Sequence, residues 1–390
     1  MYEMKTKELN LLVIIKEYPN GLAVTKKIQN ILYYLFSQKI EINVISYRSK
    51  FPQPSEKGLD NGIPYVNIGI GLDLKLLNLH KTIMYFFKGL YLILKHKKKG
   101  CKNIFYCIGA INIENLLFVF WARLLRYKLV FDVNEDYSFF EDQVKIISRF
   151  KIWTIKQLDF FTYRWATAII VVSTHLRNKY LKRNKKHILL IPVTAKENFN
   201  PNKSFFNDPL QVVYAGSFDI KDGVNYIIEG FNSFNNIYHN ARLILTGKSD
   251  QQVIYQEKYK SYSNIIFKGH LSEDEFYDLL KNADVMCMCR TNSGFANAGF
   301  PFKLGEYLAT GNPVISTKAS DVENYLTKDD AYLIDFNSPQ QIGAALTEIV
   351  NNPDVARKIG LNGMKKYQKY FSSEVNGKLL YDLLITIASE

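Results

Sequence analysis

The segment 293–316, SGFANAGFPFKLGEYLATGNPVIS, holds the side chains best suited to chemistry. Its Lys303 and Glu306 are three positions apart, so on a helix they share one face. An amine offsets phosphate charge, and a carboxylate accepts hydrogen bonds from the two hydroxyls of a ribose. The pair therefore fits a nucleoside diphosphate, although an ordinary surface ion pair has the same spacing.

The residues around this pair predict how it is positioned. Pro301 suits the first turn of a helix over 302–309, and Gly311 is placed to end that helix. A glycine-containing loop precedes the helix, and a buried strand follows it. Loop amides and the amino terminus of a helix together form an anion site, which is consistent with a phosphate ligand.

Apolar runs and helical patterns alternate along the whole chain. In the first half, the predicted strands are 9–15, 40–47, 103–108, 128–132, 168–172 and 188–191. In the second half, they are 211–215, 242–246, 265–268, 285–289, 313–316 and 332–334. This alternation predicts an α/β fold with doubly wound parallel sheets, covered by helices on both faces. Because ligands bind such sheets at the carboxyl ends of the strands, we expect the site in a cleft between two domains.

The length of 390 residues suits two domains, and a polar segment marks their boundary. Residues 196–209, KENFNPNKSFFNDP, have the composition of a linker. The predicted domains are therefore 1–195 and 210–372. We expect a closing helix at about 373–390 to pack back on the first domain.

The excess of positive charge lies entirely in the first half of the chain. Residues 1–200 contain 32 Lys and Arg against 15 Asp and Glu, a net charge of +17, whereas the remainder carries −4. No nucleic-acid motif is present, and the basic residues alternate with apolar ones, so we expect no nucleic-acid partner. The segments 80–102, HKTIMYFFKGLYLILKHKKKGCK, and 149–156 suit an anionic membrane surface, but equally a core helix ending in solvated lysines.

The sequence lacks the motifs that are typical of several other classes of protein. The four cysteines lack metal-ligand spacing, no Asp-x-Asp motif is present, and no GxGxxG follows a predicted strand, so we expect no metal, no cofactor and no dinucleotide oxidoreductase. The first residues do not resemble a signal peptide, and no uncharged apolar stretch is long enough to span a bilayer. We expect a cytoplasmic protein, peripheral on the inner membrane face if the basic segments bind lipid.

The segment FPFKLGEYLATGNPVIS resembles the donor-binding segment of the family-4 glycosyltransferases, which are retaining enzymes with the GT-B fold, two Rossmann-like domains facing a cleft. Further stretches resemble later and earlier units of that family in the same order. They are AIIVVSTHLRNKYL (168–181), VVYAGSFDIKDGVNYIIEGF (212–231), ARLILTG (241–247) and IIFKGHLSEDEFYDLLKNADV (265–285).

The resemblance implies a donor site in the second domain. Glu306 would hold the ribose hydroxyls, the loop 298–300 would follow the diphosphate and sugar, and 269–271 would lie beside the base. The full set of implied donor-binding residues is Gly216, Ser217, Lys221, Gly247, Gly269, His270, Leu271, Asn297, Ala298, Gly299, Phe300, Lys303, Leu304 and Glu306.

The sequence departs from the family pattern in the donor domain. Ala298 stands where the family often has a first glutamate, and Ser217 and Asp222 stand where it often has Arg and Lys. Lys303 or Lys221 would then supply the missing charge beside the phosphates.

A further departure lies in the first domain. Asn134 occupies the position of a frequent active-site histidine, and Glu135 and Asp136 follow it. Because Asn cannot act as a base, either acid takes that role, the reaction needs no base there, or the acids only cap a helix. The catalytic candidates are thus Asn134, Glu135, Asp136 and Lys303. Asn20 and Gly21 form a loop on the acceptor side or an ordinary turn.

These patterns lead to two functional hypotheses. The first is a retaining glycosyltransferase that moves a sugar from a nucleotide-diphosphate donor to a glycan or lipid-linked acceptor, as in bacterial surface polysaccharide synthesis. The alternative, motivated by Ser217, Asp222 and Asn134, is a catalytically inactive GT-B protein that binds nucleotides or acts as a scaffold.

Overall fold

The structure is a computed structural model that describes residues 8–47, 55–68, 79–139, 146–183, 186–196, 206–247, 249 and 251–390. The chain divides into two compact units. Unit 1 consists of Met1–Thr194 with Ser373–Glu390, and unit 2 consists of Ala195–Ser372. The chain therefore leaves unit 1, builds unit 2 and returns to unit 1 for its last helix. Most of the predicted linker lies outside the described residues.

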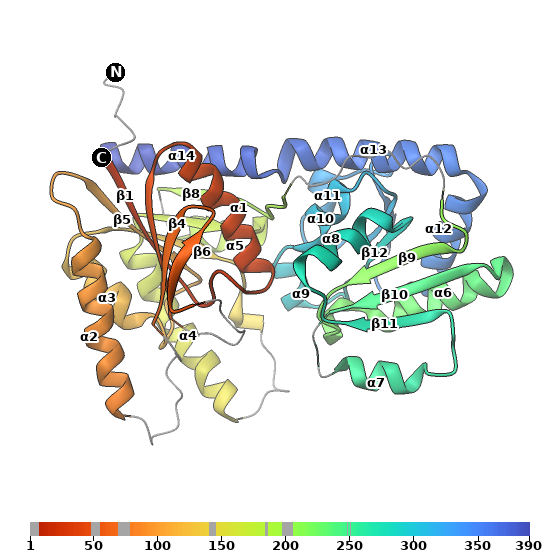
Figure 1. The fold of residues 1–390 in the computed structure, drawn as a ribbon, viewed down its shortest axis with the longest axis horizontal. Helices are drawn as coiled ribbons and strands as arrows, with labels where there is room; N and C mark the ends of the chain where they lie inside the picture. Colours follow the sequence, from red (N-terminus) through yellow and green to blue (C-terminus); the bar gives the residue numbers. More distant parts are fainter. Residues whose placement is uncertain are drawn as a thin grey trace. The chain divides into compact units, whose positions relative to one another are not determined.

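Unit 1 is built on an eight-stranded sheet of order β3-β4-β2-β1-β5-β6-β7-β8 (Figure 1). Its strands are β1 Leu9–Ile15, β2 Glu41–Ser46, β3 Lys57–Asp60, β4 Ile63–Asn67, β5 Lys102–Ile108, β6 Lys128–Val133, β7 Ala168–Val171 and β8 Ile188–Leu190. All neighbouring strands are parallel except β3 and β4, which are antiparallel.

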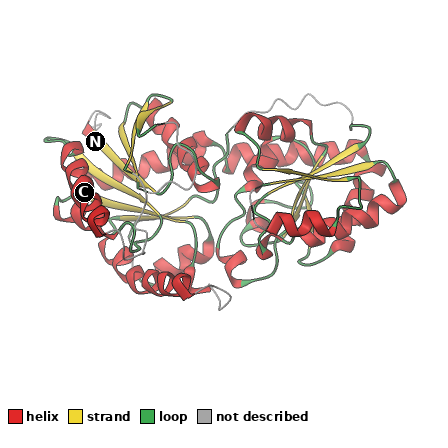
Figure 2. Ribbon diagram, turned by 60° about the horizontal axis from the view of Figure 1, so that its bottom comes forward, coloured by secondary structure: helices red, strands yellow, loops and turns green. Residues whose placement is uncertain are grey.

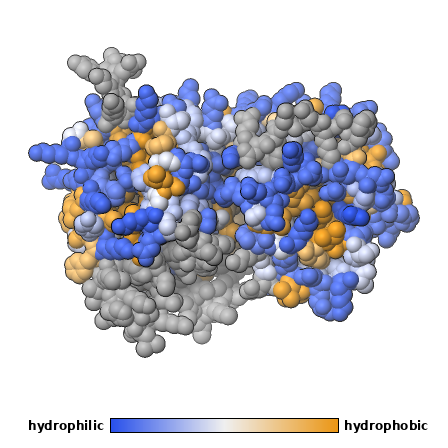
Figure 3. Space-filling view, in the orientation of Figure 1, coloured by the Kyte–Doolittle hydropathy of each residue, from blue (hydrophilic) through white to orange (hydrophobic). Residues whose placement is uncertain are grey.

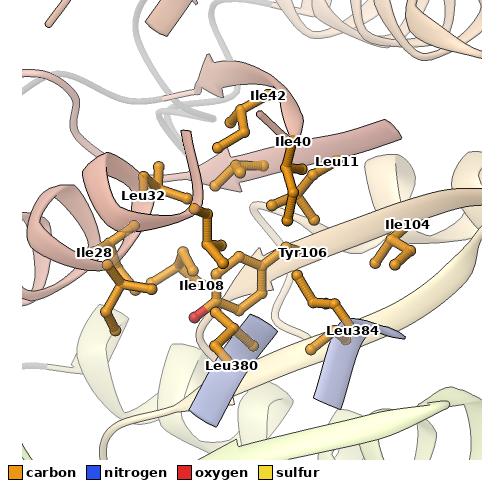
Figure 4. Close-up of a cluster of buried hydrophobic side chains, with 14 of the residues drawn as sticks. Leu11, Ile28, Leu32, Ile40, Ile42, Ile104, Tyr106, Ile108, Leu380 and Leu384 are labelled. Carbon is orange, nitrogen blue, oxygen red and sulfur yellow. The ribbon is translucent and has the colours of Figure 1, made fainter. Parts of the chain in front are cut away.

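Helices cover both faces of this sheet (Figure 2). They are α1 Ala23–Ser37, α2 Leu79–His96, α3 Leu116–Leu124, α4 Ile146–Trp165, α5 Thr174–Leu181 and α14 Ser373–Ser389. The last helix, α14, is part of the core, where Leu380 and Leu384 are fully buried and lie with Leu11, Ile104 and Tyr106 (Figure 4). Burying a leucine side chain stabilises the fold by about 1.5–3 kcal/mol, so α14 contributes substantially to unit 1.

Unit 2 contains a six-stranded, wholly parallel sheet of order β11-β10-β9-β12-β13-β14. Its strands are β9 Leu210–Ala215, β10 Ala241–Thr246, β11 Ile265–Gly269, β12 Val285–Met288, β13 Val314–Thr317 and β14 Tyr332–Ile334. Its helices are α6 Val224–Tyr238, α7 Gln251–Lys258, α8 Glu273–Asn282, α9 Gly294–Ala298, α10 Lys303–Ala309, α11 Val322–Tyr325, α12 Pro339–Asn351 and α13 Pro353–Tyr370. They again lie on both faces of the sheet (Figure 2).

Two Rossmann-like units, with a mostly parallel and a wholly parallel sheet, confirm the predicted α/β class. One pair of strands, β3 and β4, was not predicted. The sequence of β3, KGLD, lacks an apolar run, and the pair forms through its turn instead. Asn61 and Gly62 join the two strands with φ of 45° and 85°, values that suit the two-residue turn of a hairpin. None of the described helices combines the length and apolar character needed to cross a membrane.

Candidate functional site

Three glycines lie together at the carboxyl ends of neighbouring strands in unit 2. The Gly216 amide donates to the Thr246 carbonyl at 2.9 Å, and the Gly247 amide donates to the Gly269 carbonyl at 2.8 Å. Gly247 has a φ of 149°, and a Cβ built there would lie 1.7 Å from the Gly216 oxygen. Only glycine allows the backbones to approach this closely, at the edge of the sheet where a ligand is expected.

The order of the sheet reverses between β9 and β12, so the loops that follow these two strands flank the point where doubly wound sheets bind ligands. The Thr291 amide after β12 donates to the Lys221 carbonyl after β9 at 2.9 Å. The Lys221 amine lies 4.8 Å from the centre of the Phe295 ring, a cation–π contact. Backbone and side chain together tie the two loops to each other.

Tyr307 fixes α10 to the end of β9. Its hydroxyl accepts from the Ala215 amide at 2.7 Å and donates to the Ala215 carbonyl at 3.2 Å. The pairing of β9 with β12 extends to Val213 and stops before Ala215. The Tyr307 hydroxyl therefore satisfies main-chain groups of Ala215 that β12 does not reach. Burial raises the pKa of Tyr307, which keeps the hydroxyl neutral and able to donate.

The predicted pair lies on the helix that Tyr307 anchors. The Lys303 amine is 3.1 Å from Glu306 Oε2, and the two side chains are 31% and 13% exposed. Lys303 also lies 4.5 Å from the centre of the Phe276 ring, on α8. The side chains therefore form the ion pair that the spacing allowed. Because a partly exposed pair contributes only about 0–1 kcal/mol to stability, a ligand can replace the contact at little cost.

The turn after β9 is acidic where the family pattern has cations. The Ser217 hydroxyl hydrogen bonds to Asp219 at 3.0 Å and to Asp222. Gly223 then takes the left-handed conformation, with a φ of 56°, and α6 begins. Any positive charge that offsets a phosphate here must therefore come from residues other than Ser217 and Asp222.

Several predicted donor residues have buried side chains. Ala298, Phe300 and Leu304 are at most 1% exposed. The Phe300 ring packs against Tyr325 and Phe371, with centroid distances of 5.6 and 5.8 Å. These three positions can therefore offer a ligand only their main-chain atoms.

The remaining predicted positions lie on loops. The Asn297 carboxamide accepts from the Ser320 amide at 3.2 Å and donates to Asn292 at 2.8 Å, which fixes the loop before Gly299. His270 is exposed and Leu271 half-buried, directly before α8. That helix starts with a capping box between Ser272 and Glu275.

Sequence reasoning missed Arg290, the cation that follows β12. Its guanidinium donates to the Ala296 carbonyl at 2.9 Å, and its amide donates to the Thr317 hydroxyl at 3.0 Å. A charged residue directly after the apolar run VMCMC was the available signal. Arg290 places a second cation in the loops at the reversal point, beside Lys221.

In unit 1, Asp136 is held by several donors at the carboxyl end of β6. It accepts from the Ser138 hydroxyl at 2.7 Å, His175 at 2.9 Å, Lys179 at 3.0 Å and the Ser138 amide at 3.1 Å. Burial raises the pKa of this carboxyl, but the hydrogen bonds from His175 and Ser138 and the charge of Lys179 outweigh it and hold the pKa well below its usual range. Asp136 is therefore ionised and a weak base.

Asn134, directly after the same strand, belongs to a buried network. The Lys27 amine donates to Asp132 at 2.9 Å and to the Asn134 carboxamide oxygen at 3.3 Å, with the Lys27 and Asp132 side chains fully buried. Tyr106 donates to Asp132 at 2.7 Å. Glu135 lies between the two networks and is half-buried. Burial raises the pKa of the neighbouring Tyr137, and the charge of Glu135 and its hydrogen bond to Tyr137 raise it further.

The loop of Asn20 and Gly21 follows β1, where the sheet of unit 1 reverses its order between β1 and β5. Asn20 is exposed. A Cβ at Gly21 would lie 2.1 Å from the Thr25 hydroxyl, which donates to the Glu17 carbonyl at 3.0 Å. Glycine is thus required where this loop closes on the first turn of α1.

The site in unit 2 lies in a segment with known relatives. Residues 195–366 match the family model of the glycosyl transferases group 1. The match covers unit 2 almost from end to end.

Two curated relatives are also glycosyltransferases by name. An uncharacterized glycosyltransferase of Methanocaldococcus jannaschii is 25% identical over 224 residues, 57% of this chain and 60% of that protein. The capsular polysaccharide biosynthesis glycosyltransferase CapM of Staphylococcus aureus is 22% identical over 270 residues, 64% of this chain and 69% of that protein. The chain thus spans less than two thirds of the archaeal relative's length.

Solved structures match nearly the whole chain. Sucrose-phosphate synthase of Thermosynechococcus elongatus has a TM-score of 0.71 at 16% identity and covers 98% of this chain and 99% of its own. HepE of Anabaena, in complex with UDP and glucose, has a TM-score of 0.72 at 12% identity and covers 96% and 99%. At these identities the likeness shows the fold, which is GT-B as expected.

Proposed function

We propose that this protein is a retaining glycosyltransferase of family 4, in which unit 2 binds a nucleotide-sugar donor and unit 1 binds the acceptor. The observation that carries the proposal is the Lys303–Glu306 pair, anchored by Tyr307 beside the reversal point of the sheet, within the segment that matches the group 1 family model. The complexes of HepE with UDP and with UDP-glucose support a nucleoside diphosphate as the ligand.

Each group in unit 2 has a proposed role. Glu306 accepts hydrogen bonds from the ribose hydroxyls, and the Gly216 and 298–300 main chain follows the diphosphate. The residues 269–271 lie by the base. As the bond from the anomeric carbon to the diphosphate breaks, Lys303, Lys221 and Arg290 stabilise the negative charge that develops on the leaving group.

In unit 1, the contacts favour Glu135 over Asp136 if the reaction uses a base. Asp136 is ionised and engaged by four donor groups, which suits it to orienting the His175 ring and the surrounding loop. Asn134 is engaged by Lys27 and fills a positioning role. Glu135 is the acid of this stretch that neither network contains, and Glu135→Gln should lower kcat without changing the donor KM.

The test begins with the donor. A thermal-shift screen of UDP-, GDP- and ADP-sugars identifies the base, since a bound ligand raises the unfolding temperature. Glu306→Ala should then raise the donor KM roughly ten- to hundredfold, because a hydrogen bond to a charged group contributes about 1.5–3 kcal/mol. Lys303→Ala should lower kcat.

The Lys318–Asp335 ion pair, at 2.9 Å in the same unit, provides matched controls. Lys318→Ala and Asp335→Ala remove the same kinds of charge from an exposed pair outside the proposed site, and they should leave both constants unchanged. Equal kinetics in the Glu306 and Lys303 variants and in these controls would contradict the assignment.

The acidic turn of Ser217 and Asp222 favours a second candidate, a nucleotide-binding GT-B protein without activity. Such a protein would give a thermal shift with a nucleotide sugar but would neither transfer nor hydrolyse any donor. Release of the free nucleoside diphosphate from a donor at a rate that Lys303→Ala reduces would reject this alternative.

The acceptor is proposed to be a glycan or a lipid-linked sugar. The likeness to the staphylococcal CapM supports a place in surface polysaccharide synthesis. No metal is expected to take part, because the proposed site stabilises the leaving group with amines, a guanidinium and amides.

A further inference from the structure

Unit 1 contains a pocket of about 560 Å³ at the amino-terminal edge of its sheet. Six cations line it: Lys97, Lys98, Lys99, Lys102, Arg126 and Lys128. Lys102 and Lys128 begin β5 and β6, whereas the candidate catalytic loops follow the other ends of the strands. The seven residues of β5 span about 20 Å, so the pocket is separate from that edge.

The charges of this pocket are largely uncompensated by the protein. Among the described residues, Glu41 is the only carboxylate in an ion pair with a lining cation, and it contacts Lys98. Burial and the neighbouring Lys102 lower the pKa of Lys128 against a smaller opposing effect of the Glu390 carboxylate, and the Lys128 amine donates to the Ile387 carbonyl. Like charges held this close favour an anionic ligand.

The loop that carries the cations has a fixed shape. The Asn103 carboxamide donates to the Lys98 carbonyl at 2.8 Å and accepts from the Lys98 amide at 2.9 Å. Asn10 donates to the same carboxamide at 2.7 Å, and Gly100 has a φ of 82°. The cations are therefore presented by a loop whose main chain is held by hydrogen bonds.

Exposed apolar side chains lie beside the pocket. Leu94 lines it, and Phe87 and Tyr91, both 60% exposed, continue the same stripe of α2 with helical spacing. The neighbouring α3 packs against α2 through Phe118 and Gly89 and ends in Leu124, also 60% exposed. Figure 3 shows apolar surface next to hydrophilic surface on this side of unit 1.

We infer that the pocket binds the phosphate of an anionic lipid headgroup, with the exposed stripe of α2 and the end of α3 resting in the membrane interface. A soluble anion would use the cations but not the stripe, and a nucleic-acid backbone would need cations along a track rather than converging in one pocket. Cations beside exposed aromatic and aliphatic side chains are the combination that interfacial binding requires. The inference does not depend on the proposed sugar transfer.

The experiment measures flotation of the full chain with phosphatidylglycerol vesicles at low salt, with phosphatidylcholine vesicles as the neutral reference. The pocket variant is Lys97→Ser with Lys99→Ser and Arg126→Asn, where Asn tolerates the positive φ of residue 126. Binding should fall about a hundredfold, since each cation near an anionic surface contributes about fivefold. Lys97→Arg with Lys99→Arg should bind like the wild type.

A matched control removes three exposed cations of unit 1 outside the pocket, by Lys57→Ser, Arg177→Ser and Lys182→Ser. It changes the net charge by the same amount but leaves the pocket intact, so it should retain most of the binding. A second pair of variants tests the stripe. Phe87→Gln with Tyr91→Gln should weaken flotation at least tenfold, whereas Ile237→Gln with Ile254→Gln, at least as exposed on unit 2, should not.

Three results would overturn the inference. The wild type could fail to float with phosphatidylglycerol at low salt, or the pocket and control variants could lose binding equally, which would leave only diffuse attraction. Third, inorganic phosphate or a nucleic acid could compete with the vesicles for the wild type but not for the pocket variant, while the double substitution at Phe87 and Tyr91 leaves flotation unchanged. That result would assign the pocket to a soluble anion or a nucleic acid.

Discussion

The hydroxyl of Tyr307 offers the sharpest test of how the proposed donor site is held. Tyr307→Phe removes one oxygen and with it the bonds at 2.7 and 3.2 Å to the amide and carbonyl of Ala215. The side chain is fully buried, so water cannot replace the lost partner of the Ala215 amide. A buried group left unsatisfied costs about 1–3 kcal/mol, and we expect the variant to lose about 2 kcal/mol of unfolding free energy.

Calorimetry would detect this loss as a lower unfolding temperature for unit 2. For a unit of this size each kcal/mol lowers the temperature by about 2–4 °C, so the expected shift is about 4–8 °C. Because Tyr307 ties the helix bearing Glu306 to β9, the donor KM should rise as well, with the acceptor KM unchanged.

Tyr332 provides the control in the same unit. Its side chain is buried, and its hydroxyl has no hydrogen-bond partner among the described residues. Tyr332→Phe should therefore leave the unfolding temperature and the donor KM unchanged. If Tyr307→Phe were as stable as Tyr332→Phe, the phenol would not anchor α10, and the structural basis of the donor site would be refuted.

The remaining predictions concern other contacts. Gly247→Ala should abolish donor binding in a thermal-shift assay, because a Cβ would collide with the Gly216 carbonyl; retained binding would contradict the close approach. Lys27→Met should cost about 3–5 kcal/mol in urea unfolding, because it leaves the buried Asp132 charge unpaired. Asp136→Asn should destabilise the protein at pH 7. Since the folded pKa of Asp136 is lowered, its contribution to stability is fully present above the unfolded pKa of about 3.9. That contribution is lost progressively as the pH falls from there through the lowered folded pKa, so wild type and variant should converge only in strong acid. Dialysis against EDTA should leave sugar transfer unchanged, and restoration of a lost activity by Mg²⁺ would reject the metal-independent mechanism.

The strands were predictable because their signal is local. The run LNLLVII gave β1 its observed bounds of Leu9–Ile15, and the helix predicted at 302–309 begins one residue later, at Lys303. The hairpin of β3 and β4 escaped prediction because Lys57–Asp60 has no apolar run. Its formation depends on a turn at Asn61 and Gly62, which is recognised only when flanked by a clear strand pattern.

The site was predictable only in part. Lys303 and Glu306 were found because their spacing of three lies within one helix, where neighbours are known from the sequence. The donors around Asp136 could not be found in this way, since His175 is 39 residues away and is brought close only by the order of β6 and β7. The same holds for Tyr307 and Ala215, which are 92 residues apart.

The return of α14 to unit 1 has a consequence for the order in which the protein matures. Unit 2 is one continuous stretch, Ala195–Ser372, so a ribosome delivers all of it before the last helix emerges. Unit 1 begins first, yet its core lacks Leu380, Leu384 and Ile387 until all of unit 2 has been synthesised. Unit 1 can therefore complete its core only after unit 2 has been made, and the nascent chain must keep that core open until α14 arrives.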